Sequence, residues 1–479
     1  MIEITRKEEC CGCSACSQAC PKSCISMTSD NEGFLYPHVD PSICINCGLC
    51  EKVCNILHPR EERKPLNVLA AINNDDNVRM KSSSGGIFHI LAERTIKKGG
   101  VIFGARLDES WQVVFDYAET LADVEPFMGS KYVQAKVGSA YKTAKRFLDE
   151  GKDVLFSGTP CQIAGLHQYL RKDYPNLLAV DFVCHGVPSP KVWGKYLDGF
   201  QQNLKQIGGI EFRNKGRGWS NFSFKVSAEP DTCSLFIPFN KSHYMKAFLS
   251  DIILRPSCYE CRSKGGRSLS DITLADFWGI SSVAPEMNDD KGTSMVFINT
   301  EKGKAVLDFN AFRHEETTYE RVKPLNPACF RSPARPVKRD YFFKMLDSTE
   351  DMTALNTLID RCTRPSVKKR LVRAYYSLRQ IAKKFIIFII RGGQKTNSTY
   401  TYTYTYTIAR MPQNPKITGL CFRDKSGGWQ SYGMVLQLRN QNDENWNIHT
   451  TAHNKLWRDS SELCPANYSE KLGTRRCNI

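Results

Sequence analysis

Eight cysteines near the N-terminus are spaced so that their thiolates could ligate metal clusters. They form two runs with identical gaps, C-x-x-C-x-x-C-x-x-x-C, within the first 54 residues. Four thiols this close together can wrap the irons of one cubane cluster. The runs consist of Cys10, Cys13, Cys16 and Cys20, and of Cys44, Cys47, Cys50 and Cys54.

This arrangement is that of bacterial two-cluster ferredoxins, in which the fourth cysteine of each run binds the other cluster. The spacing therefore predicts two 4Fe-4S clusters with crossed ligands. We expect one on Cys10, Cys13, Cys16 and Cys54, and the other on Cys44, Cys47, Cys50 and Cys20. Pro21 follows Cys20, whereas Asn55 stands where a second proline is expected. Cys11 and Cys24 fall outside the spacing and are expected to be small buried residues.

Disulfides and zinc are the alternatives, and both fit the spacing less well. Disulfides suit secreted chains, but residues 1–9 contain no apolar segment that would direct export, so we expect a cytoplasmic protein. Zinc usually takes two C-x-x-C pairs separated by a longer loop. Iron–sulfur clusters are therefore the favoured interpretation.

The composition indicates a globular chain with a basic C-terminal stretch. Of 479 residues, 41% are hydrophobic, which is enough for several domains, and the net charge is +16. Residues 361–391 hold many Lys and Arg and no acid. No nucleic-acid-binding motif accompanies them, so we expect no nucleic-acid partner. The segment 367–391 is predicted to be helical, either packed on the protein or in peripheral contact with a membrane surface.

The order of predicted elements indicates an α+β protein. A bacterial ferredoxin-like domain is followed by a mixed α/β domain with a helical C-terminal part. Buried strands are expected at 68–72, 100–104, 153–157 and 177–183, with helices at 86–98 and 162–171. An antiparallel region begins near Gly208 and includes strands at 271–275 and 295–298. The expected domains are 1–60, 66–200, 201–345, 346–395 and 396–479.

The last of these ranges differs from the rest of the chain. Residues 399–407 alternate Thr and Tyr, and 422–429 repeat the pattern of 212–219 at a constant offset. The partners of the upstream copy are not repeated. We therefore interpret 396–479 as a low-complexity linker and a truncated internal repeat without its own function.

A second group of cysteines is predicted beside the sheet. Cys161 and Cys184 follow the strands at 153–157 and 177–183, at the edge where open parallel sheets bind ligands. Cys258 and Cys261 form a C-x-x-C pair that could chelate one centre with them. The sequence thus favours a third 4Fe-4S cluster, while zinc and four unrelated buried cysteines remain alternatives.

Three turns could hold the phosphates of a cofactor. One leads directly into a helix whose free N–H groups favour an anion, and the others are Gly-Ser-Lys-Tyr and Gly-Thr-Pro turns. No G-x-G-x-x-G or Walker loop is present, which disfavours a standard nicotinamide or ATP site. The candidate cofactor-binding residues are Ser83, Ser84, Gly85, Gly86, Ser130, Lys131, Tyr132, Gly158, Thr159, Pro160 and Gln162.

Residues 82–300 resemble the beta subunit family of coenzyme F₄₂₀ hydrogenases and dehydrogenases. The similar segments are 82–86, 129–132, 156–162, 181–186, 212–219, 255–261 and 276–279. The resemblance implies FAD flanked by iron–sulfur clusters, and it does not fix the substrate. FAD also suits the chemistry, because clusters pass single electrons while organic substrates exchange two.

These features predict an iron–sulfur flavoprotein oxidoreductase. It would relay electrons between a ferredoxin or another redox protein and a small organic substrate. The alternative is a non-catalytic electron-transfer subunit of a larger complex, and a basic RNA-binding module has only the charge in its favour. Lys131, His185 and Asp276 are the candidates for proton transfer.

Overall fold

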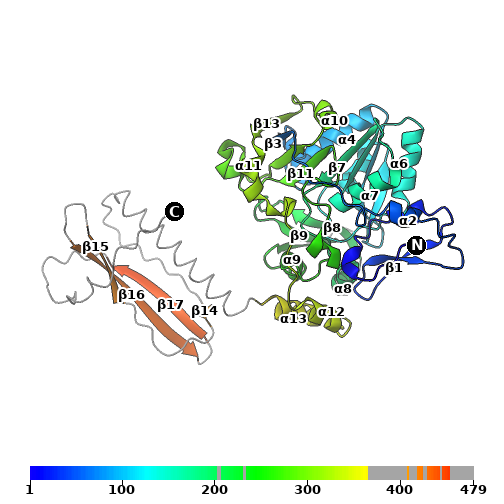
Figure 1. Cartoon of the computed structure of the whole chain (residues 1–479). Helices are drawn as coiled ribbons and strands as arrows, with labels where there is room; N and C mark the ends of the chain where they lie inside the picture. Colours follow the sequence, from blue (N-terminus) through cyan, green and yellow to red (C-terminus); the bar gives the residue numbers. More distant parts are fainter. Residues whose placement is uncertain are drawn as a thin grey trace. The chain divides into compact units, whose positions relative to one another are not determined.

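The structure is a computed structural model that describes residues 1–201, 206–229 and 233–364, together with the backbone of four strands between 407 and 453. The chain forms two compact units, Met1–Ser366 and Val367–Ile479. The first contains both groups of cysteines (Figure 1). Among the described residues, no helix is long and apolar enough to cross a membrane.

The two N-terminal cysteine runs adopt the same backbone conformation. Gly12 and Asn46, at equivalent positions, have φ values of 71° and 53°, and their N–H groups donate to Cys10 Sγ and Cys44 Sγ, each at 3.4 Å. A short helix follows each run's second cysteine, and an antiparallel hairpin separates the runs. The elements are α1 (Ala15–Ala19), β1 (Ile25–Ser29), β2 (Leu35–Val39) and α2 (Leu49–Lys52).

An eight-stranded mixed sheet forms the centre of the first unit. Its order is β13-β3-β12-β11-β7-β6-β4-β5, and β4, β6, β7 and β11 are parallel neighbours. This confirms the predicted mixed α/β domain. The strands are β3 (Asn67–Asn73), β4 (Val101–Leu107), β5 (Val113–Ala118), β6 (Val154–Gly158), β7 (Leu177–Phe182), β11 (Ile272–Asp276), β12 (Ser294–Ile298) and β13 (Phe312–Thr317).

Helices cover both faces of this sheet, which explains why its central strands are almost wholly apolar. On one face α4 packs over residues such as Leu69, Leu155 and Ile272. On the other, α6 and α7 cover Phe103 and Phe156. The helices along this sheet are α3 (Asp76–Lys81), α4 (Ile87–Lys97), α5 (Leu121–Val124), α6 (Ala140–Asp149), α7 (Pro160–Leu170), α10 (Glu301–Ala305) and α11 (Tyr319–Val322).

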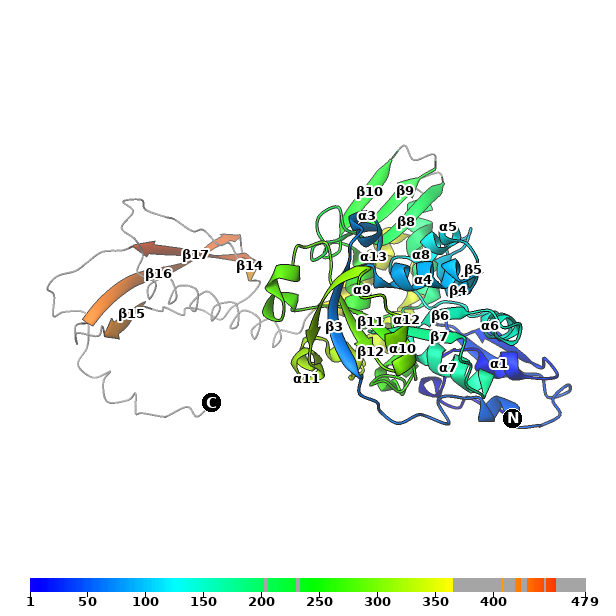
Figure 2. The ribbon, with the colours of Figure 1, turned by 90° about the horizontal axis from the view of Figure 1, so that it is seen from above.

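The N-terminal module packs against α7, on the side of the sheet that α6 and α7 cover (Figure 2). Gly165 permits the contact, because a Cβ there would lie 2.9 Å from Cys13 Cβ and 3.0 Å from Cys13 Sγ. Any larger residue would push the first cysteine run away from the sheet.

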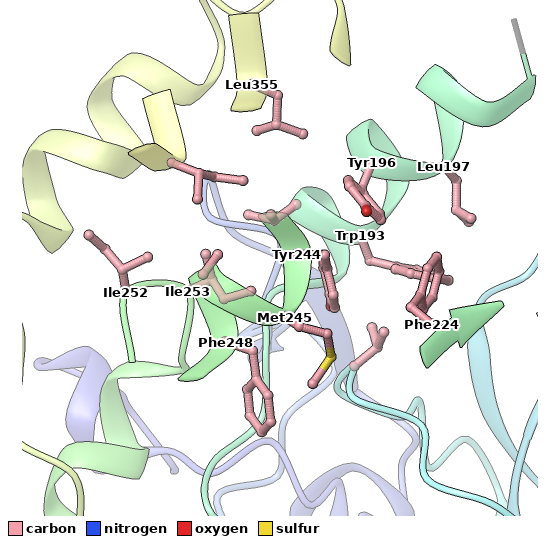
Figure 3. Close-up of a cluster of buried hydrophobic side chains, with 14 of the residues drawn as sticks. Trp193, Tyr196, Leu197, Phe224, Tyr244, Met245, Phe248, Ile252, Ile253 and Leu355 are labelled. Carbon is pink, nitrogen blue, oxygen red and sulfur yellow. The ribbon is translucent and has the colours of Figure 1, made fainter. Parts of the chain in front are cut away.

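A smaller antiparallel sheet of β8, β9 and β10 lies apart from the main sheet (Figure 2). It packs with four helices around a core rich in aromatic rings, including Trp193, Tyr196, Phe224 and Tyr244 (Figure 3). Its elements are β8 (Ile207–Asn214), β9 (Ser223–Ala228), β10 (Ser234–Pro238), α8 (Pro190–Gln201), α9 (His243–Leu249), α12 (Arg339–Leu346) and α13 (Met352–Thr363).

The strands β11 and β12 differ from the expectation in their location. We predicted them as the close of the antiparallel region, but β11 pairs parallel with β7, and β12 joins it to β3 in the main sheet. Both are buried on two faces, so their apolar pattern suits the centre of a large sheet. The ranges 66–200 and 201–345 therefore share one sheet.

The C-terminal predictions fall largely outside the described residues. This applies to the helix and the membrane contact expected at 367–391 and to the repeat at 399–407. The described strands of the second unit form an antiparallel sheet, β14-β17-β16-β15. They are β14 (Thr407–Ile408), β15 (Thr418–Arg423), β16 (Trp429–Asn442) and β17 (Asn445–His453). The repeated Phe422-Arg423 lies in β15, as Phe212-Arg213 lies in β8.

A buried ion pair ties the N-terminal hairpin to the C-terminal helices. Arg339 is fully buried and binds the Glu32 carboxylate through two bonds of 3.0 and 2.5 Å. Its Nε also donates to Leu254 O at 3.1 Å. This pair holds three distant segments together.

We expect Arg339→Leu to lower the free energy of unfolding by roughly 3–5 kcal/mol, because it leaves Glu32 buried without its main partner. Urea unfolding followed by tryptophan fluorescence under anaerobic conditions would measure the loss. Lys64→Ala is the matched control, since it removes an exposed pair with Glu320 and should cost less than about 1 kcal/mol. Equal, small losses in both variants would contradict this assignment.

Candidate functional site

The fourth cysteine of the first run lies with the second run. Cys20 lines one cavity together with Cys44, Cys47 and Cys50, at the end of the module that contains Met1. Cys54 in turn lies near Cys10 and Cys16, since both of their thiols interact electrostatically with it. The crossed assignment of the two clusters remains a prediction, and this grouping is compatible with it.

Burial raises the pKa of the Cys16 and Cys54 thiols, which keeps them protonated in the absence of metal. It raises the pKa of Cys16 to about 12, and the neighbouring thiols of Cys10 and Cys54 contribute to this rise. Cluster assembly must therefore release protons, because the thiolate is the form that binds iron. Cys11 and Cys24 are buried, and Cys24 Sγ lies 3.3 Å from Cys20 Sγ.

The second group of cysteines comes together at the carboxyl edge of the main sheet. Cys161 opens α7 directly after β6, and Cys184 follows the neighbouring strand β7. Cys258 and Cys261 lie at a 3-10 turn, Pro256–Glu260. The pKa of Cys184 is raised by burial and also by the thiols of the other three, so all four lie within electrostatic reach.

Two cations compensate for the charge that four thiolates would bring. Lys264 lowers the pKa of Cys184 and Cys261, and Arg255 lowers that of Cys161 and Cys258, against the larger effect of burial. Both cations are themselves buried. The donor set of four thiols with two buried cations fits an anionic cluster.

Among the described residues, no three His, Cys, Asp or Glu side chains converge closely enough to hold a single metal ion. A cubane needs wider spacing, because each thiolate binds a different iron. The spread of the thiols is therefore compatible with clusters at all three positions.

The Ser83–Gly86 turn follows β3 and α3 and is held firmly by the sheet. Ser84 Oγ donates to Thr293 O at 2.7 Å, and Gly85 N–H donates to Ser294 Oγ at 2.9 Å. A Cβ at Gly85 would lie 2.3 Å from Ala71 O, so the glycine is required by packing. Gly86, with a φ of 83°, is the N-cap residue of α4.

The 129–132 turn lies against the Ser83 turn. Ser130 Oγ and Ser83 Oγ are 2.8 Å apart, and the space around Gly129 is open. Lys131 Nζ donates to Pro126 O and Met128 O, at 2.6 and 2.8 Å, and burial lowers the pKa of Lys131 to about 7. The Lys131 amino group thus stabilises the turn in which Lys131 lies. The Tyr132 ring stacks on Phe248.

The turn at 158–162 caps α7. The Thr159 N–H and hydroxyl both bind Gln162 Oε1 at 2.9 Å, and Thr159 Oγ1 lies 3.2 Å from Cys161 Sγ. Pro160 occupies the first turn of the helix, and a Cβ at Gly158 would meet Gln162 Oε1 at 3.2 Å. These residues orient Cys161.

Arg213 and Asp276 form a buried pair at the same sheet edge. Arg213 Nη1 binds Asp276 Oδ2 at 2.5 Å, and Trp219 Nε1 donates to the other carboxylate oxygen at 3.3 Å. Trp219 stacks on Trp278, with ring centroids 4.6 Å apart. Arg213 Nε and Nη2 are buried and have no hydrogen-bond partner in the described part of the chain.

The side chains of the three candidates for proton transfer bind different partners. Asp276 is bound by Arg213, and Lys131 by backbone carbonyls. His185 Nε2 lies 2.5 Å from Asp251 Oδ1, and its ring packs edge-on against Phe248. His185 is 38% exposed and follows Cys184, so it is the most accessible of the three.

The sequence interpretation gave no role to Lys215 or Arg255, although both lie in segments that suggested the family. Lys215 Nζ donates to three carbonyls, including Ser84 O at 2.8 Å, and burial lowers its pKa to about 7. Arg255 binds Cys10 O at 2.8 Å. The apolar run Ile252–Leu254 before Arg255 was an available indication, whereas the residues beside Lys215 are polar and offered none.

Comparisons with known proteins agree with this architecture. Residues 151–321 match the family model for the C-terminal part of the beta subunit of coenzyme F₄₂₀ hydrogenase/dehydrogenase, and residues 9–56 match that of the 4Fe-4S dicluster domain. This confirms the resemblance: the chain has a dicluster domain followed by a domain of the beta subunit family. It therefore contains a 4Fe-4S dicluster domain, and residues 151–321 match a family described as a hydrogenase/dehydrogenase beta subunit.

Two individual proteins are similar to parts of the chain. A ferredoxin 7Fe from Hydrogenibacillus schlegelii is 40% identical over 42 residues, which are 9% of this chain and 47% of that ferredoxin. The chain thus spans about half the length of this curated relative. A protein of the F₄₂₀-reducing NiFe hydrogenase complex from Methanosarcina barkeri is 20% identical, with a TM-score of 0.39, and the match covers 64% of this chain and 93% of that protein.

We expect Cys20→Ala to remove the cluster of the second run and to spare that of the first, because Cys20 lies in the second run's cavity. Electron paramagnetic resonance of the reduced protein would distinguish the two signals. Cys24→Ala is the matched control, since Cys24 lines the same cavity but lies outside the repeated spacing. Loss of the first run's signal instead would refute the crossed assignment.

Proposed function

We propose that this chain is an iron–sulfur flavoprotein oxidoreductase, which relays electrons between a ferredoxin or similar redox protein and a small organic substrate. The observation that supports this best is the position of the cysteines and the candidate cofactor residues. Cys161 and Cys184 follow the parallel strands β6 and β7, and the Ser83 turn, which Ser130 contacts, lies beside the carboxyl end of β3. This edge is where such sheets bind ligands.

The edge is long enough for an extended dinucleotide. From β3 to β6 it spans five neighbouring strands, which is roughly 19 Å at the usual strand separation. The Ser83 turn adjoins β3, and Cys161 follows β6. FAD bound along the edge would bring its phosphates near the first and its redox-active ring toward the second.

Several residues have free groups that suit FAD. The unpaired Nε and Nη2 of Arg213 could donate to phosphate or ring oxygens, and the open space beside Gly129 could admit them. FAD would supply the exchange between one-electron and two-electron chemistry. The residues Ser83, Gly86, Ser130, Tyr132 and Arg213 would hold it, and Lys215 would fix the Ser84 carbonyl behind it.

His185 is the residue we propose for proton transfer. Its Asp251 partner would hold the imidazole in one orientation. Asp276 would instead orient Arg213, and Lys131 would hold its own turn in shape. We place the protein in the cytoplasm, as expected from its thiols.

The alternative is an electron-transfer subunit that has no catalysis of its own. The family description, a beta subunit, favours it. Turnover of an artificial donor by the isolated chain would decide against this alternative, whereas flavin binding is expected for both.

We expect Arg213→Ala to weaken FAD affinity by roughly tenfold to a hundredfold for each charged hydrogen bond lost. Flavin released on denaturation of the purified variant would measure this. Arg217→Ala, an exposed arginine in the same segment, is the control and should retain wild-type flavin. Iron content reports whether Arg213→Ala still folds, and normal flavin in a folded variant would move the site elsewhere.

A further inference from the structure

Asn55 occupies the position where the repeated ferredoxin pattern has a proline, and its side chain is buried. Only 4% of the residue is exposed. In the first run, Pro21 stands at the equivalent place and has no N–H or amide group to offer. The substitution therefore adds a polar side chain to the contact between the N-terminal module and the main domain.

The amide of Asn55 contacts residues of two different cysteine groups. Its Nδ2 donates to Cys161 O at 3.2 Å and lies 3.5 Å from Ser263 Oγ. Its Oδ1 lies 3.5 Å from Cys11 Sγ and 3.7 Å from Cys13 Sγ. Because the Cys161 carbonyl can only accept, the amide nitrogen must face it, which fixes the orientation of the side chain.

Cys11 completes this contact. Cys11 Sγ lies 3.5 Å from Asn55 Oδ1, so its thiol can donate to the amide oxygen. Cys11 also lies close to Cys161, although it is outside the repeated spacing. The buried amide is thus satisfied on both sides, which explains why it is tolerated in the interior.

We propose that Asn55 is the bonded bridge through which the first N-terminal cluster site is coupled to the Cys161 site. Asn55 is covalently joined to Cys54, a proposed ligand of the first cluster, and one hydrogen bond joins its side chain to Cys161, a proposed ligand of the third. In the described part of the chain, this path leads from Cys54 through the peptide bond to Asn55, and from the Asn55 amide through one hydrogen bond to Cys161. Electron transfer is faster through bonded paths than across gaps, so the bridge would direct electrons into the Cys161 centre.

This proposal rests on the proposed function, because it needs a cluster at both sites. Asn55 is a positioning residue in this account and does not itself touch a substrate. Outer-shell partners of metal ligands typically affect function by roughly 10- to 100-fold.

The test compares wild type with Asn55→Ala and Asn55→Asp. Asp fills nearly the same space but, as a carboxylate, has no N–H to donate to Cys161 O. Asn31→Ala is the control, because Asn31 is an exposed amide of the same module. Stopped-flow reduction with dithionite, with spectra taken as the clusters and flavin are reduced, measures transfer between the sites. Potentiometric titration by paramagnetic resonance gives the potential of each cluster.

We expect both Asn55 variants to keep wild-type iron and to slow reduction of the Cys161 centre by roughly 10- to 100-fold. Wild-type rates in both would overturn the bridge while leaving the proposed function intact. If wild-type protein holds about eight irons in place of about twelve, the third centre fails and the bridge fails with it. Iron content therefore separates the two failures.

Discussion

The geometry of the whole site depends on one fully buried guanidinium, that of Arg255. It donates to Cys10 O at 2.8 Å, to Leu35 O at 2.9 Å and to Gln134 Oε1 at 3.0 Å. Its plane also lies 4.2 Å from the centre of the Tyr36 ring. Arg255 thus joins the first cysteine run, the N-terminal hairpin and the main domain at a single point.

This position links two of the proposed cluster sites. Cys258 is three residues from Arg255, within the same short turn, and Cys10 is bound through its carbonyl. Burial alone would lower the pKa of Arg255, but the surrounding thiols of Cys10, Cys11 and Cys258 raise it. The charge is therefore permanent, and it offsets the negative charge that thiolate-bound clusters would introduce. Asn55 and Gly165 bring the same surfaces together from the other side of the first run.

The sequence was most informative where local spacing decides the structure. The two cysteine runs and the loops that follow β6 and β7 could be located from residue order alone, because ligand spacing and strand edges are local properties. Contacts between segments that are distant in the sequence could not be located in this way. Arg255 and Cys10 are 245 residues apart, and nothing in either segment specifies their hydrogen bond. The parallel pairing of β11 with β7 was missed for the same reason.

For some residues, the sequence suggested a role in cofactor binding, whereas the structure gives them a role in packing. Gly85 was expected to admit a phosphate, yet its Cα faces Ala71 O and Ser294 N, and its N–H is already bonded. Thr159 and Gln162 cap α7 and orient Cys161. Conversely, the sequence indicated Arg213 only as part of a segment similar to the family. The structure adds that two of its side-chain nitrogens are buried without a hydrogen-bond partner in the described part of the chain.

The central claim is that three cysteine groups bind three clusters beside a flavin, and that Arg255 links two of these sites. Quantifying iron and flavin in anaerobically reconstituted wild type and in Cys258→Ala tests it most directly. Exposed Cys233 provides a control through Cys233→Ala. The account predicts about twelve irons and one flavin per chain in wild type and control, and about eight irons in Cys258→Ala. About eight irons in all three proteins would contradict it.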